Sequence, residues 1–99
     1  TVWVLFVDDD RRVYVGMAIG PGDDLGPLEY DGLAHIIGDV DPPGVVIAIT
    51  RDDGEPLAAD WRLWEEMRGR LAASRCELID VIIVGRHSWW AAVAGRPVA

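Results

Sequence analysis

Three short and almost uninterrupted apolar runs most constrain the fold of this 99-residue chain. They are Val2–Val7, Val45–Ile49 and Leu78–Val84, and all are rich in β-branched side chains. Apolar runs of this length without alternating polar residues are typical of β-strands that are buried on both faces. The sequence therefore predicts that these three segments are inner strands of a sheet.

The segments between these runs predict a hairpin partner and two helices. Val13–Ile19 follows a short polar turn and is expected to form a hairpin with the first run. Pro27 is placed to start a helix over about Leu28–Gly38, and a second helix is expected over about Leu57–Ser74. Trp89–Val93 is expected to form a short edge strand.

The predicted order of elements, β-β-α-β-α-β-β, indicates an α/β fold with a single mixed β-sheet and two main helices. The sequence contains no internal repeat and no linker long enough to separate two units. Residues 1–99 are therefore expected to form one domain.

The charge balance excludes several classes of partner. The chain has 17 acidic residues against nine arginines and no lysine, and its net charge is −8. Nucleic-acid binding depends on clustered cations that neutralise phosphates, so no nucleic-acid partner is expected. No apolar run approaches the roughly 18 residues of a membrane span, so no membrane partner is expected either. The single cysteine, Cys76, cannot form an internal disulfide and is expected to be a small buried hydrophobe, which fits a cytoplasmic location.

Two segments resemble the JAB/MPN metalloprotease-like family, and within it the RadC-like branch. The first runs from Ile49 to Asp60, and the second, Leu78–Gly85, reads Leu-Ile-Asp-Val-Ile-Ile-Val-Gly. In that branch the corresponding strand ends in His-x-His-Pro-Ser-Gly, the helix opens with Pro-Ser-x-x-Asp, and the later strand reads Leu-Leu-Asp-His-x-Ile-x-Gly. The resemblance covers nearly the whole chain and implies a cytidine-deaminase-like architecture.

The resemblance places the family's metal-binding and catalytic positions on four residues. Thr50 and Asp52 stand where the family has its two metal-binding histidines, and Asp60 falls on the third ligand position. Glu29 resembles the family's general-base glutamate at the start of the first helix. Threonine is a poor ligand, and two carboxylates without imidazole suit a hard cation better than zinc. We therefore expect that zinc has been lost, that no metal or cofactor is bound, and that these four positions are vestigial.

Structural roles also explain these carboxylates and the two histidines. Asp52 is typical of a solvated turn, and Asp60 is expected to face the core side at the first turn of its helix, where a carboxylate satisfies N–H groups. For Asp60, this interpretation and a remnant ligand position both remain open. His35 is expected on the core side of the first helix and His87 in a turn, and neither is expected to replace the lost ligands.

Five tryptophans are a large excess for a chain of this length. Trp64 is expected in the core stripe of the second helix, with Trp61 at the edge of that stripe. Trp89 and Trp90 are adjacent on a predicted strand, so their side chains should point to opposite faces and at least one should be partly exposed. The sequence leaves two interpretations: all belong to the core, or Trp61 and one of this pair bind a protein partner or a second copy.

The sequence thus predicts a catalytically inactive JAB/MPN-like domain that acts as a protein-interaction or assembly module. One alternative is a metal-dependent hydrolase that uses the carboxylates of Glu29, Asp52 and Asp60 with a different metal. Another is a small-molecule binding module that uses the vacated cleft beside Thr50. Hydrolysis is the less favoured function, because several positions of one site depart from the family pattern.

Overall fold

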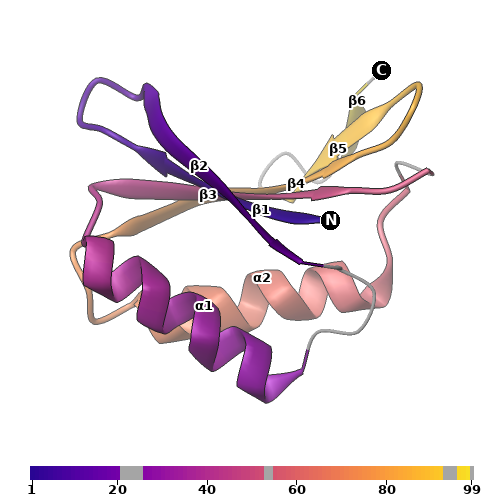
Figure 1. Cartoon of the computed structure of the whole chain (residues 1–99). Helices are drawn as coiled ribbons and strands as arrows, with labels where there is room; N and C mark the ends of the chain where they lie inside the picture. Colours follow the sequence, from indigo (N-terminus) through magenta and orange to yellow (C-terminus); the bar gives the residue numbers. More distant parts are fainter. Residues whose placement is uncertain (21–25, 53–54, 93–95, 99) are drawn as a thin grey trace.

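The chain forms two layers, a six-stranded sheet and two helices that both lie on the same face of it (Figure 1). The computed structural model describes residues 1–20, 26–52, 55–92 and 96–98. The strands are β1 (Val2–Val7), β2 (Val13–Gly20), β3 (Gly44–Thr50), β4 (Glu77–Val84), β5 (Trp89–Ala91) and β6 (Arg96–Val98); the helices are α1 (Pro27–Val40) and α2 (Ala58–Leu71). The predicted α/β class, mixed sheet, two helices and β-β-α-β-α-β-β order are confirmed, and β6 is an additional strand.

The strands lie side by side in the order β2-β1-β3-β4-β5-β6. β3 and β4 are parallel, and all other neighbours are antiparallel. The prediction of an edge strand over Trp89–Val93 is wrong in one respect: β5 pairs on both sides and β6 is the edge, while Val93 lies outside the described residues. A three-residue strand that contains a proline, Pro97, carries too little periodic pattern to be predicted.

The hydrophobic core fills the space between the helices and one face of the sheet. The helices contribute one stripe of residues each, spaced by three or four positions as on one helix face. Arg70 of α2 also links the two helices, because its Nε donates to Asp31 Oδ1 at 2.9 Å and its guanidinium lies 5.3 Å from the centroid of the Tyr30 ring. The residues of this core cluster are Val2, Val4, Phe6, Tyr30, Leu33, Ile37, Val45, Ile47, Ile49, Leu63, Met67, Leu71, Cys76, Val81, Ile83, Trp90 and Ala92.

The opposite face of the sheet is covered by no element among the described residues; we call it the open face. Its central residues follow from the pairing register, which runs Trp3, Ala48 and Ile82 across β1, β3 and β4. The next ladders add Leu5 beside Val46, and Thr50 beside Val84 and Trp89. The side chains of Trp3, Val84 and Trp89 are 39%, 38% and 40% exposed.

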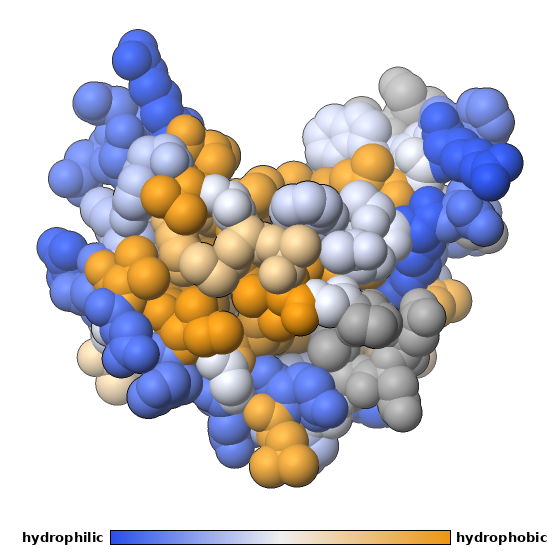
Figure 2. All heavy atoms as spheres, viewed as in Figure 1, coloured by the Kyte–Doolittle hydropathy of each residue, from blue (hydrophilic) through white to orange (hydrophobic). Residues whose placement is uncertain are grey.

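The open face is concave. The β1–β2 hairpin and the β5–β6 pair both rise on the side away from the helices (Figure 1). Figure 2 shows the resulting hollow between two raised ends, with hydrophobic side chains along its lower border. In a single copy of the chain, the prediction that the inner strands are buried on both faces is therefore wrong, because both helices pack on the same side of the sheet.

The described helices of the chain include none that is long and apolar enough to cross a membrane.

Neighbouring residues of β1 test which face of the sheet forms the core. Phe6 is fully buried beneath the helices, whereas Leu5 lies on the open face and is only half-buried. We expect Phe6→Ala to lower the free energy of unfolding by roughly 3–5 kcal/mol through cavity formation, and Leu5→Ala by less than about 1.5 kcal/mol. Urea denaturation followed by circular dichroism measures both. Equal losses would contradict the one-sided core.

Candidate functional site

The candidate site lies where β3 ends and α2 begins. β3 ends at Thr50, and the Arg51 N–H then donates to the Val84 carbonyl at 2.9 Å, which extends the pairing with β4 by one residue. Leu57 is the N-cap of α2, and Asp60 is the third residue of the helix. The N-termini of α1 and α2 lie at the same end of the helical layer (Figure 1). This end therefore holds all four positions that the resemblance singled out.

Asp60 is the buried charged residue of the described chain, with only 2% of its surface exposed. The guanidinium of Arg51 binds both of its carboxylate oxygens, with Nη1 2.7 Å from Oδ2 and Nη2 in contact with Oδ1. The Leu57 N–H also donates to Oδ2, at 2.7 Å. The Arg51 side chain is itself only 13% exposed, so the ion pair is largely shielded from solvent. Asp60 is thus held by a cation and by the cap of its own helix.

This arrangement does not fit a zinc centre. A metal ligand must direct a free lone pair at the ion, whereas both Asp60 oxygens already accept charge-assisted hydrogen bonds. The fixed positive charge of Arg51 would also repel a second cation at the same place. Among residues 1–20, 26–52 and 55–92, no group of three or more His, Cys, Asp or Glu side chains is arranged to hold a metal ion.

The structure gives Thr50 and Asp52 separate surroundings. Thr50 is exposed and tied to the start of the chain, because its N–H and Oγ1 both donate to the Thr1 carbonyl, at 2.9 and 3.3 Å. The Asp52 side chain is 93% exposed and lies 3.5 Å from Arg86 Nη2. An exposed pair at this distance contributes little to stability. The interpretation of Asp52 as a solvated residue agrees with this placement.

Glu29 caps its own helix. It is exposed at the third position of α1, where its Oε2 accepts the Gly26 N–H at 2.9 Å. This bond satisfies one of the N–H groups that every helix start leaves without an intrahelical partner, and the negative charge also favours this end of the helix. A structural role therefore accounts for the carboxylate of Glu29.

The two histidines and the cysteine do not form a site. The prediction that His35 faces the core is wrong: it is exposed, and its Nε2 lies 3.3 Å from Asp39 Oδ2. The core stripe of α1 runs on the other side of the helix, through Tyr30, Leu33 and Ile37. His87 is exposed in the turn before β5, as expected. Burial raises the pKa of the Cys76 thiol, and Asp41 raises it further, so the reactive thiolate is disfavoured.

The tryptophans divide between the two faces of the sheet. Trp90 is buried on the helix side, and Trp61 of α2 packs edge-on against it with ring centroids 4.7 Å apart. Trp61 is 42% exposed, on the helix side, whereas Trp89 is exposed on the open face. Trp64 is partly buried and packs against the core. Trp61 and Trp89 therefore lie on opposite sides of the sheet and cannot belong to one flat contact surface.

A comparison with protein-family models finds no match to this chain, and a comparison with curated proteins finds none either.

Sequence reasoning missed Arg51 and Trp3. Arg51 is the only cation between residues 50 and 60, which also contain Asp52, Asp53, Glu55 and Asp60. An acidic residue expected to face the core requires a partner, so this lone arginine was the available signal. Trp3 had a weaker signal, because it stands inside an apolar run that resembles ordinary core.

Removing one member of the Arg51–Asp60 pair should strongly destabilise the fold. We expect Asp60→Ala to lower the free energy of unfolding by roughly 3–5 kcal/mol, because it leaves Arg51 charged and largely buried and also removes the cap on Leu57. Arg51→Ala should have a comparable effect, and the double variant should lose less than the sum. Denaturant unfolding of the three variants gives the coupling energy.

The exposed Asp52 is the matched control for this cycle. Asp52→Ala should change stability by no more than about 0.5 kcal/mol, since its interaction with Arg86 is solvent-exposed. A carboxylate whose only role was to bind a metal would not stabilise the metal-free protein, whereas one that is paired with Arg51 would. If Asp60→Ala left the stability of the metal-free protein unchanged, or raised it, the pairing with Arg51 would not be a stabilising interaction.

Proposed function

We propose that this domain is a JAB/MPN-like assembly module without hydrolytic chemistry, and that a second copy of the chain covers its open face. The order of the elements from β1 to β5 matches the order in the family that the chain resembles, which supports the proposal. The third ligand position is engaged by Arg51, which supports the loss of metal chemistry. One observation carries the proposal. The apolar sequences of the inner strands are typical of strands that are buried on both faces of a sheet, whereas the two helices cover only one face.

The open face has the properties of an interaction surface. Strands with continuous apolar runs normally have both faces covered, and β3 and β4 form the parallel pair for which this holds most strictly. On the open face Val46, Ala48, Ile82 and Val84 instead remain partly accessible, beside the exposed indoles of Trp3 and Trp89. Contiguous apolar area flanked by large aromatic side chains marks protein contact sites in soluble proteins.

A second copy fits this face by charge and by size. The strands that form the face carry few charges there: Asp80 is half-buried, and its Oδ1 accepts the Val81 N–H at 2.8 Å. The domain measures 33 × 31 × 22 Å, so its faces are close in size to the roughly 800 Å² that each partner contributes to a stable complex. Two twisted sheets can pack face to face about 10 Å apart, and because the open face is hollowed between two raised ends, the packing that suits it is the one in which the two sheets cross at about a right angle. A two-fold axis would place Trp3 and Trp89 of both copies in one interface.

The domain should therefore self-associate through the two indoles of the open face. We expect a concentration-dependent dimer in sedimentation velocity, and we expect Trp3→Ala and Trp89→Ala each to weaken it. Truncation of an aromatic hot spot typically costs at least about 2 kcal/mol, which is roughly thirtyfold in dissociation constant. Association should strengthen with salt, because salt screens the repulsion between two protomers of charge −8.

Trp61→Ala is the matched control. Trp61 belongs to α2, packs against Trp90 on the helix side of the sheet, and is about as exposed as Trp89. This substitution should leave the dissociation constant unchanged within about twofold. A larger effect of Trp61→Ala than of Trp89→Ala would instead place the interface on α2 and the C-terminal strands. A monomer at every protein and salt concentration would exclude the second copy as the occupant of this face.

The hydrolase alternative makes an opposite prediction for metal binding. We expect no stoichiometric zinc to be retained after dialysis against a mild chelator, because the ligand set is Thr50, a solvated Asp52 and an Asp60 that is paired with Arg51. Elemental analysis of the dialysed protein measures this directly. Retained zinc that Asp60→Ala releases would contradict the proposal.

Hydrolytic activity would also contradict the proposal of an assembly module without hydrolytic chemistry. If Mn²⁺ or Co²⁺ produced peptide or isopeptide hydrolysis that Glu29→Gln abolished, an enzyme with altered carboxylate ligands would be the better description. Conservative replacement of Glu29 keeps its side-chain size, so loss of activity without loss of fold would assign it a chemical role.

A further inference from the structure

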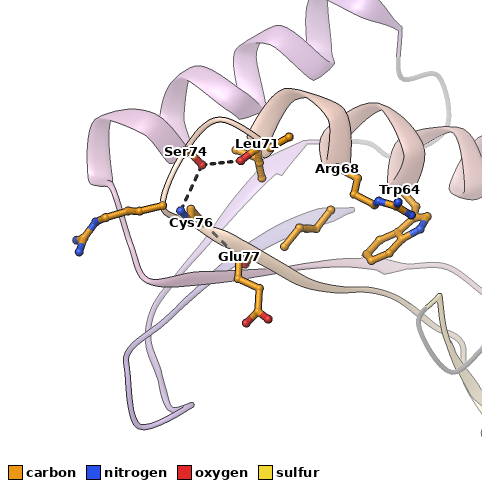
Figure 3. Close-up of a pocket in the computed structure, with 9 residues that line it drawn as sticks. Trp64, Arg68, Leu71, Ser74, Cys76 and Glu77 are labelled. Carbon is orange, nitrogen blue, oxygen red and sulfur yellow. Dashed lines mark hydrogen bonds between the residues drawn. The ribbon is translucent and has the colours of Figure 1, made fainter.

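A cavity of about 440 Å³ lies between the C-terminal half of α2 and the start of β4, away from the candidate site (Figure 3). Trp64 and Arg68 border it from α2, and the Leu78 side chain borders it from β4. The connecting turn is held by Ser74, whose Oγ donates to the Leu71 carbonyl at 2.9 Å and accepts the Cys76 N–H at 3.3 Å. The lining residues are Trp64, Arg68, Leu71, Ala72, Ser74, Arg75, Cys76, Glu77 and Leu78.

The cavity runs along a free edge of the sheet. β5 pairs with β4 only at residues 82–84, and the Ala92 N–H donates to the Val81 carbonyl at 3.0 Å, so no described strand lies beside Glu77 and Leu78 on that side. The Glu77 N–H donates inward, to the Pro43 carbonyl at 3.0 Å. The register of β4 against β3 shifts between Leu78 and Asp80. Before this irregularity the backbone groups alternate between the two sides of the strand, so the N–H and C=O of Leu78 point outward. The edge therefore offers a donor and an acceptor to an additional strand.

The groove also carries a positive charge in a strongly acidic chain. Arg75 is neutralised by Asp41, with Nε 2.9 Å from Oδ2. Arg68 is exposed at the rim and, in the part of the chain that the structure describes, has no carboxylate within ion-pair distance. An unpaired guanidinium beside apolar Trp64 and Leu78 is suited to a ligand that combines a carboxylate with an apolar group.

We propose that this groove binds an extended acidic peptide segment of a partner protein, which adds to the edge of β4. Alternate side chains of the bound segment point towards α2. One of them is apolar and lies over Leu71 and Leu78, and the next one on the same face, two positions away, is a carboxylate that binds Arg68. The backbone of Leu78 provides affinity, and the two side-chain contacts provide specificity. The groove is open to solvent along its length, whereas small-molecule sites enclose most of their ligand, so a peptide is the better occupant.

The probe is a fluorescein-labelled hexapeptide, acetyl-Thr-Leu-Thr-Glu-Thr-Thr-amide, measured by fluorescence anisotropy on the full chain. We expect saturable binding that Arg68→Gln weakens at least about tenfold, as loss of a charge-assisted hydrogen bond predicts. Arg62→Gln is the matched control, because Arg62 is exposed on the same helix outside the cavity. It should change binding by less than about twofold. A peptide with Lys in place of Glu should bind at least about tenfold more weakly.

The amide of Leu78 distinguishes strand addition from simple ion pairing. In ¹⁵N-resolved NMR spectra, bound peptide should shift this amide and slow its hydrogen exchange. Absence of saturable binding, equal binding by Arg68→Gln, or an unaffected Leu78 amide would each overturn the proposal. The proposal would also be overturned if hexanoate produced the same chemical-shift changes as the peptide, because the site would then bind small anionic amphiphiles. The outcome is independent of self-association through the open face.

Discussion

The arrangement of the molecule depends on one constraint. Three adjacent strands, β1, β3 and β4, are largely apolar on both faces, and the described elements of the chain cover only one of the two faces. The parallel pairing of β3 with β4 requires a crossover connection, and α2 provides it on the same side as α1. One face thereby becomes the core. The other face keeps partly exposed hydrophobic side chains, and this pattern is the basis of the proposed assembly role.

The Arg51–Asp60 pair gives the buried charge at the start of α2 a structural role. At the start of α2, Asp60 accepts a hydrogen bond from the Leu57 N–H and thereby caps its own helix. Once buried, its charge needs a cation, and the guanidinium of Arg51 provides one with fixed bidentate geometry. The end of the molecule that the resemblance assigns to catalysis is then held together by hydrogen bonds. Its chemistry is that of a helix cap.

Much of the fold was predictable because the sequence signals are local and strong. The order of elements followed from runs such as Val45–Ile49 and Leu78–Val84, from Pro27 at the start of α1 and from Pro56 just before α2. Three features were not predictable, because they depend on contacts distant in sequence or on weak patterns. His35 lies on the outer side of α1, β6 is too short to show a period, and one-sided coverage by the helices is a property of topology. Among the site residues, Arg51 had only its charge as a signal.

The most direct test of the account is an isotope-filtered nuclear Overhauser experiment on a mixture of labelled and unlabelled protein. It reports only contacts between different copies of the chain. We predict intermolecular contacts from the indoles of Trp3 and Trp89 to apolar groups of the open face, such as those of Ile82 and Val84. Absence of such contacts at concentrations where the protein is fully associated, or contacts that involve Trp61 instead, would contradict it.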